Sequence, residues 1–556
     1  MNPDTAEMAI VDPAVVRAQL GAGTAGAQVA AAESAAAQAG EALAGAAPLP
    51  AAGRLGRGSL GQRWRGLPGR GLAARVRASD PARAQALRES WKALWVSRAL
   101  VWAAGVGAVA TLGFGPNRNA FNPPGVTSGF GWLGNLLAAP AARWDAAWYL
   151  VIAHYGYRPE LGSFTSSRDA FFPLYPLGVS ALAHVGVQPV LAGVLVSLLA
   201  FGAALYGIHR LTTLELGSGL RRGSVDVARL TVLVTALAPM AFFFSAVYSE
   251  SLYLALSVGV FLCARRGRWM WVGVLGALAA ATRSAGIVLL APALLLYLYG
   301  PREDRAPDWE RAREDRLPDS DRAREDRLSD SDRAREDRLL DRERAREARA
   351  YDWRTMRARA RAWVRPRYRL RRDLLWLALM PAGLGAYMAY LWLAGGDALA
   401  PFHAQDVWQR HFAGPYLGVW DGVKAAFDGA RQLLSGQRGH VYFPIAGGSP
   451  FITAGHNLML LAFLVVGLAL LLAVLRMLPL AYGVYIVAAL ALPLSYPVAP
   501  QPLMSLPRFL VVLFPLSMVI GAWLAARPRA RAPVLIVSAA MMMFFVAEFA
   551  TWHWVA

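Results

Sequence analysis

Cysteine and lysine are nearly absent from this chain of 556 residues. Cys263 is the single cysteine, which excludes an internal disulfide framework and a cysteine-based metal site. Lysine occurs only at positions 92 and 424, although lysine and arginine together number 57. The first ninety residues also lack an early apolar run. We therefore expect no cleavable signal peptide, and the first span would act as an uncleaved signal.

Motifs that bind soluble phosphate donors are missing as well. The sequence has no Walker loop, no dinucleotide-binding glycine pattern and no serine nucleophile elbow. A cytoplasmic nucleotide is therefore not expected as the active donor. The formal net charge of +20 does not predict nucleic-acid binding, because the arginines flank apolar runs, where they indicate membrane orientation.

Long apolar runs dominate what the chain does contain. Hydrophobic residues make up 56% of it, and many runs approach the roughly 20 residues that cross a bilayer. We predict an all-α, polytopic integral membrane protein that binds membrane lipids. Its spans are expected near residues 95–114, 189–209, 228–247, 249–265, 269–283, 284–299, 374–394, 455–475, 478–496, 508–526 and 533–552.

The arginine-rich loops predict the orientation. If residues 171–187 crossed the membrane, the arginines within 210–229 and 265–268 would lie outside. A short interfacial or re-entrant helix at 171–187 instead places both groups inside, together with Arg476 and the arginines of 527–531. This gives about eleven crossings, with two long outward loops: 115–188, which carries interfacial helices, and 395–453.

Two polar regions flank or interrupt the membrane modules. Residues 1–92 are expected to form a disordered basic cytoplasmic tail before an N-terminal module at 93–299. Residues 300–373, ahead of a C-terminal module at 374–556, form a charged cytoplasmic insertion with four eleven-residue repeats of the type "ERAREDRLPDS". That period suits a helix, which Pro318 interrupts. A solvated spacer and a partner-binding helix both stay open for this segment.

Asp145 is the sharpest catalytic candidate on the outward side. In "RWDAAWY" it lies beside Arg143, Trp144, Trp148 and Tyr149. Partial desolvation by the tryptophans would make this carboxylate a stronger base, with Arg143 tempering the effect. Asp145 could then take a proton from an acceptor hydroxyl. The alternative is an interfacial helix whose aromatic residues anchor in headgroups while Arg143 and Asp145 merely pair.

Other charged residues gather on the same side. Glu250 begins a helix, where it is either a first-turn acid favoured by the helix dipole or a metal- or sugar-binding group. Arg283 and Arg508 lie at helix edges, where a guanidinium can bind a lipid phosphate or extend toward the interface. Asp169 lies in the first outward loop.

The stretch "FHAQDVWQRHF" offers a further cluster. If it were one helix, His403, Asp406 and Arg410 would lie on one side. Its two histidines are eight residues apart and lack a third ligand, so we expect no zinc site, although a divalent cation as cofactor stays open. Carbohydrate stacking on Trp408 and Trp420 is favoured over metal binding.

Six ordered motifs resemble those of a known family. They are "RWDAAWYLVIAHYGY", "AFFPLYPL", "PMAFFFSAVYSESLYLALS", "GALAAATRSAGI", "PFHAQDVWQRHFAGP" and "SLPRFLVVLFPL", and together they span most of residues 95–526. The sequence resembles the PIG-V family, the second mannosyltransferase of GPI-anchor assembly with its bacterial relatives, in the GT-C superfamily. The N-terminal tail and the repeats lie outside this pattern.

The resemblance implies a GT-C-type bundle and an inverting transfer of mannose or a related hexose. The donor would be a polyprenyl or dolichyl phosphate sugar, the acceptor a lipid or glycan, and the site would face outward or toward the lumen. Asp145 matches the family's loop acid, and the pair Trp148-Tyr149 departs from His-Phe of eukaryotic members, which argues against a GPI acceptor. The residues expected to bind substrate are Arg143, Trp144, Trp148, Tyr149, Asp169, Glu250, Arg283, His403, Arg410 and Arg508.

Two other functions stay open from the residues alone. A lipid-linked-sugar transporter or flippase would place polar residues mid-membrane on broken helices. A non-catalytic scaffold would bind partners through the cytoplasmic repeats. The heavy use of arginine over lysine indicates a GC-rich bacterial genome, so we expect a multi-pass protein of a bacterial plasma membrane.

Overall fold

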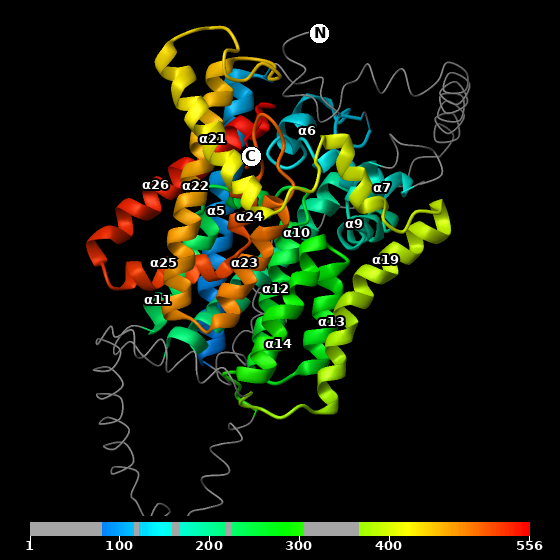
Figure 1. Cartoon of the computed structure of the whole chain (residues 1–556), viewed down its shortest axis with the longest axis vertical. Coiled ribbons are helices and arrows are strands. Elements are labelled where there is room, and N and C mark those ends of the chain that lie inside the picture. The colour runs from blue at the N-terminus through cyan, green and yellow to red at the C-terminus, as the bar shows by residue number, and fades with distance from the viewer. Residues whose placement is uncertain are drawn as a thin grey trace, which may run out of the picture.

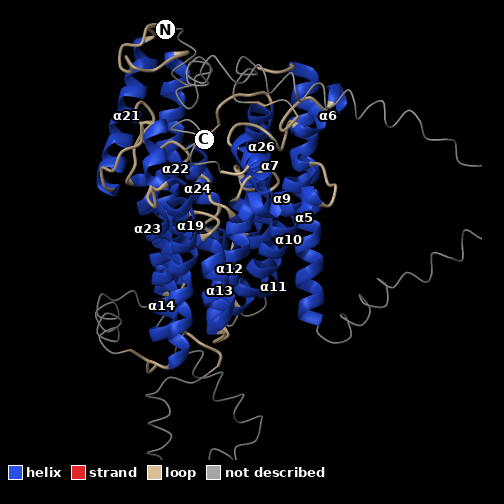
Figure 2. Cartoon of the chain, turned by 90° about the vertical axis from the view of Figure 1, so that its right-hand side faces the viewer, coloured by secondary structure: helices blue, strands red, loops and turns tan. Residues whose placement is uncertain are grey.

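The computed structural model describes residues 81–115, 122–123, 125–157, 167–217, 224–304 and 366–555. Within these ranges the chain is helical and holds no sheet, as the sequence predicts (Figure 2). Five helical segments are long and apolar enough to cross a membrane. They are Pro81–Leu112, Pro189–Leu216, Arg372–Gly395, Pro450–Met477 and Pro528–Ala550. These segments indicate a multi-pass membrane protein.

The N-terminal half alternates long helices with short ones. Its α-helices are α5 (Pro81–Leu112), α6 (Gly131–Ala138), α7 (Ala146–Tyr155), α9 (Leu174–His184), α10 (Pro189–Leu216), α11 (Ser224–Leu237), α12 (Glu250–Arg265), α13 (Trp269–Ala280) and α14 (Leu290–Tyr299). Its 3₁₀ turns are η4 (Ser167–Ala170), η5 (Ala241–Phe244) and η6 (Ser284–Leu289). The expected short helix within 171–187 is α9, which at 11 residues is too short to span a bilayer.

The C-terminal half follows the charged insertion, whose residues 305–365 lie outside the described ranges together with its repeats. Its α-helices are α19 (Leu379–Gly395), α20 (Ala400–His403), α21 (Pro415–Ser435), α22 (Pro450–Met477), α23 (Leu480–Leu494), α24 (Leu506–Val511), α25 (Phe514–Ala525) and α26 (Pro528–Ala550). Its 3₁₀ turns are η7 (Arg372–Ala378) and η8 (Ala404–Trp408). Prolines at the first turns of α21, α22 and α26 suit positions where a backbone N–H has no partner.

Several expected boundaries are wrong. The span predicted at 228–247 ends as an α-helix at Leu237, because Pro239 follows and the chain continues into η5. The span predicted at 508–526 is likewise two helices, α24 and α25, separated at Leu513 before Pro515. Residues 81–92, assigned to the disordered tail, are the first turns of α5. Residues 1–80 lie outside the described ranges.

A buried arginine stabilises the break after α11. Arg98 of α5 is 2% exposed and donates hydrogen bonds to the carbonyl oxygens of Ala236 (3.2 Å) and Ala241 (2.8 Å) and to the hydroxyl of Ser245 (2.9 Å). These acceptors lie where the helix stops and its carbonyl groups lose their partners. Arg98 therefore holds the irregular segment 238–249 that delivers Glu250 to the start of α12.

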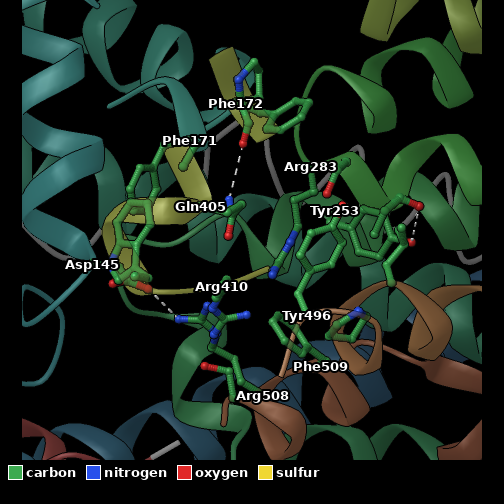
Figure 3. A pocket seen from close by; sticks show the side chains of 18 of the residues that line it. Asp145, Phe171, Phe172, Tyr253, Arg283, Gln405, Arg410, Tyr496, Arg508 and Phe509 are labelled. Atoms are coloured by element: carbon green, nitrogen blue, oxygen red, sulfur yellow. Dashed lines mark hydrogen bonds and ion pairs between the residues drawn. The ribbon is translucent and has the colours of Figure 1, made fainter. Parts of the chain in front are cut away.

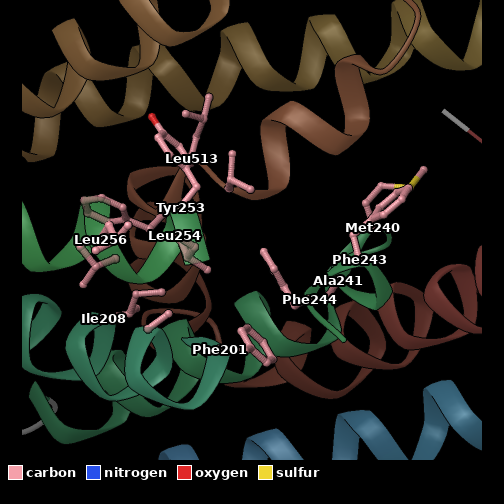
Figure 4. Packing of buried hydrophobic residues seen from close by; sticks show 14 of the residues in the cluster. Phe201, Ile208, Met240, Ala241, Phe243, Phe244, Tyr253, Leu254, Leu256 and Leu513 are labelled. Atoms are coloured by element: carbon pink, nitrogen blue, oxygen red, sulfur yellow. The ribbon is translucent and has the colours of Figure 1, made fainter. Parts of the chain in front are cut away.

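Aromatic residues fill the core beside this segment. Phe201 of α10 stacks on Phe244 of η5 with ring centroids 4.6 Å apart (Figure 4). The ring of Phe242 contacts that of Phe549 of α26, with centroids 5.2 Å apart. All four side chains are buried. Contacts of this kind tie α10, η5 and α26 together, so the segment before Glu250 is fixed from several sides.

The two ends of the bundle carry different elements. The first turn of α5, the end of α14 and the chain leading into η7 lie at the lower end in Figure 1. Helices α6 and α21 lie at the upper end (Figure 1). The start of the described chain and both stems of the charged insertion thus share one end, and α6 and α21, from the two expected outward loops, share the other.

Candidate functional site

A cavity of about 260 Å³ lies among elements from both halves of the chain (Figure 3). Its polar wall contains Asp145, Arg283, Arg410 and Arg508. Its other walls are mainly aromatic and aliphatic, from Tyr149, Phe171, Phe172, Tyr253, Ala285, Trp408, Ala489, Leu492, Tyr496, Phe509, Leu513 and Trp554. Such a cavity can hold a polar group and an apolar chain side by side.

The backbone before α7 directs Asp145 to this cavity. Trp144 adopts a left-handed conformation, with φ of 55°, and its indole contacts those of Trp552 and Trp554 at 5.6 and 5.2 Å. The left-handed conformation is unfavourable for a non-glycine residue, so the surrounding aromatic packing must hold Trp144 in place. The carboxylate at the next position then faces Arg508 (Figure 3).

Four charged side chains form one connected chain of ion pairs. Arg508 donates from Nη1 to Oδ2 of Asp145 at 2.7 Å, and its Nε lies 3.3 Å from Oε1 of Glu250. Arg283 donates to the same Glu250 oxygen at 2.8 Å. The ring of Phe509 lies 5.3 Å from the Arg283 guanidinium and 5.5 Å from that of Arg508. The shared carboxylate and this ring allow two like charges to lie close together.

Arg410 is the third arginine of the cavity and differs from the other two. Within the described ranges it forms no ion pair with a carboxylate. Burial lowers the pKa of Arg410 to about 10, and the positive charge of Arg508 adds to this decrease. The negative charge of Asp145 acts to raise the pKa. Three guanidinium groups therefore share the site with two carboxylates, Asp145 and Glu250. The formal excess of one positive charge suits an anionic ligand.

The alternative in which Arg143 merely pairs with Asp145 is not what the structure shows. Arg143 is 3% exposed and donates to the carbonyl oxygens of Ala550 (3.2 Å) and Ala142 (3.0 Å), with its guanidinium 4.9 Å from the Trp552 ring. The left-handed backbone of Trp144, between Arg143 and Asp145, turns the two side chains in different directions. Arg143 therefore ties the turn before α7 to the end of α26.

The residues expected to bind substrate divide into two groups. Tyr149, Arg283, Arg410 and Arg508 line the cavity with Asp145. Arg143, Trp144, Trp148, Asp169, Glu250 and His403 do not line it. Glu250 is 1% exposed and lies behind the arginines that it holds. Trp148 is buried and stacks on Phe171, which does line the cavity.

Residues 403–410 do not form the single helix that would place His403, Asp406 and Arg410 on one side. Helix α20 ends at His403, η8 follows, and Gln409 has a left-handed backbone with φ of 53°. His403 is mostly exposed and pairs with Asp397 at 2.8 Å, away from the cavity. Gln409 immediately precedes Arg410, so the break changes the chain direction at the residue that enters the site.

Asp169 lies in η4, one residue before the cavity wall begins at Ala170. Its side chain is buried, and Oδ1 has no hydrogen-bond partner among the described residues. Burial raises the pKa of Asp169 to about 7, with a smaller rise from the charge of Asp397 and a decrease from Arg168. Asp169 can thus change its protonation near neutral pH.

Trp554 and Tyr496 line the cavity but were not predicted as site residues. Tyr496 ends the expected span 478–496, and Trp554 follows the expected span 533–552. Aromatic residues collect at such membrane interfaces, and that position was the available signal. Trp420, expected to stack on carbohydrate, does not line the cavity, whereas Trp408 does.

A divalent cation does not fit the described side chains. Asp145 and Glu250 each bind arginine through one oxygen, and within the described ranges no three His, Cys, Asp or Glu side chains gather as a metal site. A metal at either carboxylate would lie beside guanidinium groups of the same charge sign.

Comparison with known proteins identifies the central segment. Residues 117–297 match a family model described as mannosyltransferase (PIG-V). GPI alpha-1,6-mannosyltransferase 2 of Cricetulus griseus is 32% identical over 184 residues, and the protein of the same name from Rattus norvegicus is 31% identical over 185 residues. Each match covers 31% of this chain and 35% of the relative, and no solved structure matches.

The matched segment contains Asp145, Glu250 and Arg283, whereas Arg410, Arg508 and Trp554 lie beyond it. The cavity is therefore completed by residues that the comparisons do not reach. The six motifs predicted the same family from the sequence. Residues 117–297 are thus similar to the PIG-V mannosyltransferase family, and the chain spans about a third of the length of the relatives that it matches.

Proposed function

We propose that this protein transfers mannose from a polyprenyl or dolichyl phosphate carrier to a hydroxyl of a lipid or glycan acceptor. The observation that carries the proposal is the cavity in which Asp145 faces three arginines, one of them without an ion pair. The family match supports mannose as the sugar. The cavity has a polar wall and apolar walls, which suit the phosphate and the lipid chain of a lipid-linked donor.

The arginines hold the donor phosphate in this mechanism. The donor phosphodiester binds between Arg410 and Arg508, where positive charge is in excess. Each of these arginines can donate charge-assisted hydrogen bonds to the phosphate oxygens. As the bond between the anomeric carbon and the phosphate oxygen breaks, the electron pair stays on that oxygen. The guanidinium groups stabilise the developing charge. Arg283 acts through Glu250, which keeps both arginines in position.

Asp145 acts as the general base. Arg508 occupies its Oδ2, and we assign Oδ1 to the acceptor hydroxyl. The acceptor oxygen attacks the anomeric carbon from the side opposite the phosphate, and its proton passes to Asp145. A single displacement inverts the anomeric centre and needs no covalent intermediate. The products are a mannosyl acceptor and a polyprenyl monophosphate.

The membrane placement belongs to the same proposal. We assign the bundle to the GT-C type, with about eleven crossings formed by the five long segments and by the shorter or broken helices between them. The site faces outward from a bacterial plasma membrane, and the stems of the charged insertion face the cytoplasm. The shared location of these stems and the first turn of α5 supports that orientation (Figure 1).

The test uses the purified full chain, labelled polyprenyl-phosphate-mannose and a panel of acceptor lipids. A labelled glycolipid with an inverted anomeric linkage is expected, and its structure identifies the acceptor. Movement of intact donor across proteoliposomes without a new glycosidic bond would instead establish a flippase. A scaffold would be favoured if the protein showed neither transfer nor transport, and if a partner protein that binds the full chain no longer bound after removal of residues 305–365.

A further inference from the structure

Helix α21 has two opposite faces of unlike composition. One face is built from small residues and packs on the bundle: Gly418, Gly422, Ala425, Ala426 and Gly429 are buried. Gly418 lies so close to the carbonyl group of Leu494, and Gly422 to the side chain of Leu503, that a Cβ would clash at either position. Small residues of this kind allow close helix packing within membranes.

The other face is apolar and uncovered. Tyr416, Trp420, Val423, Phe427 and Leu434 follow the spacing that returns to one side of a helix, and all five are exposed. Phe427 is 64% exposed and Leu434 is 87% exposed. We name these five residues the α21 stripe. A stripe of this size is uncommon on a water-facing surface.

The charged residues of α21 do not indicate which partner covers the stripe. The polar flank of α21 pairs with itself, through Lys424 with Asp421 at 2.8 Å and Arg431 with Asp428 at 3.7 Å. These two pairs leave the flank without formal net charge. Burial of apolar surface is then the main force available for docking, and it does not require an anionic partner.

The neighbouring surface points to lipid as the occupant. Helix α21 packs along α22, which is the most apolar of the five span-length helices and has a small buried share. Val465, Val466 and Leu472 of α22 are exposed, as expected for a helix in contact with lipid. Figure 2 shows α21 at the outer edge of the bundle beside α22. The exposed ring of Phe412, ahead of α21, contacts Tyr496 of the cavity at 5.7 Å.

We propose that the α21 stripe is a lipid-docking surface, covered by the acyl chains of the leaflet at the site end of the bundle. The expected outward loop 395–453 then contains a helix that belongs to the membrane domain. Through Phe412 and Tyr496, the end of this surface lies next to the cavity wall. The assignment concerns the stripe alone and does not depend on which reaction the cavity performs.

The single cysteine makes the test direct. In a Cys263→Ala background, Phe427→Cys places a fluorescent label on the stripe, and Lys424→Cys places the same label on the polar flank one turn away. Both native side chains are exposed, so neither substitution disturbs the core. Each variant is reconstituted in phosphatidylcholine nanodiscs, with or without brominated acyl chains, and folding is checked by size-exclusion chromatography.

We expect brominated lipid to quench the label at position 427 several-fold more strongly than the label at 424, and aqueous iodide to show the reverse order. Equal iodide quenching at both positions would place the stripe in water and overturn the proposal. Protection of position 427 from both quenchers would mean that protein covers it, either a partner or a second copy, and would overturn it as well. A label at Trp420→Cys must agree with the one at 427.

Discussion

At the lower end of the bundle, beside the end of α14, Arg265 pairs with Glu215 and Arg302 pairs with Asp304, while at the cavity Arg508 and Arg283 pair with Asp145 and Glu250. Both ends thus join arginines to carboxylates over short distances. They differ in what surrounds the pairs. Arg302 lies among the rings of Trp269, Tyr297 and Tyr368, at 4.8 to 5.2 Å, and Tyr482 donates to Glu215 at 2.8 Å.

At the cavity end, in addition, Arg410 has no ion pair among the described residues and lines an open volume beside the Asp145 carboxylate. A buried pair alone is weak evidence of function, because structural pairs occur widely. Excess charge facing a cavity is stronger evidence, since nothing in the fold requires it. Substitutions at the two ends should therefore separate activity from stability.

The largest effect is expected from Asp145→Asn. The amide keeps the size of the side chain and can still bond to Arg508, but it cannot accept the acceptor proton. Mannosyl transfer should fall about 100- to 10,000-fold, the usual contribution of a general base. The measurement is turnover with saturating donor, next to thermal unfolding in detergent. Wild-type turnover in a folded Asp145→Asn protein would remove this residue from the mechanism.

Glu215→Gln should give the opposite result at the lower end. Glu215 and Arg265 are 4% and 8% exposed, so the substitution leaves a buried guanidinium without its counter-charge. Loss of one partner from a buried pair costs about 3–5 kcal/mol of unfolding free energy. Equilibrium unfolding should show this loss, whereas turnover per folded molecule stays near wild type. A variant of normal stability with poor turnover would contradict the separation of the two ends.

The sequence predicted the members of the site better than their partners. Asp145, Glu250, Arg283, Arg410 and Arg508 could all be selected from motifs and from the cost of placing charge near a bilayer. The pairing of Asp145 with Arg508 could not be predicted, because 363 residues separate them and local periodicity carries no such information.

Local neighbours were misleading for a physical reason. Arg143 lies two positions from Asp145, yet the left-handed turn at Trp144 separates their directions, and Arg143 bonds to the end of α26. The helix breaks at Leu237 and Leu513 were hidden inside apolar runs, where composition alone favours one continuous span. The prolines near both breaks were the available signal.

Arg410→Ala tests the excess charge itself. Because Arg410 forms no ion pair in the described ranges, its removal should leave unfolding unchanged. It should raise the KM for the donor about tenfold to 100-fold, the range expected when one charged hydrogen bond is lost. Arg410→Lys should recover part of the affinity, since it restores charge without the planar fork. Arg438→Ala, an exposed arginine of the same loop region, is the matched control. Equal donor KM in the Arg410 and Arg438 variants would exclude phosphate binding by Arg410.

The smallest effect is expected from replacing residues 305–365 by a flexible glycine-serine linker. Both stems of the insertion are fixed to the bundle without it, because Glu303 donates its N–H to Arg265 and Arg367 donates its N–H to Leu298, each at 2.9 Å. Turnover and unfolding should therefore match wild type. Arg302→Ala in the full-length chain is the contrast, since it removes a guanidinium packed among three rings and should lower stability by about 2 kcal/mol. Loss of transfer on replacing residues 305–365 alone would show that the insertion takes part in function. The lower end would then be a second functional region.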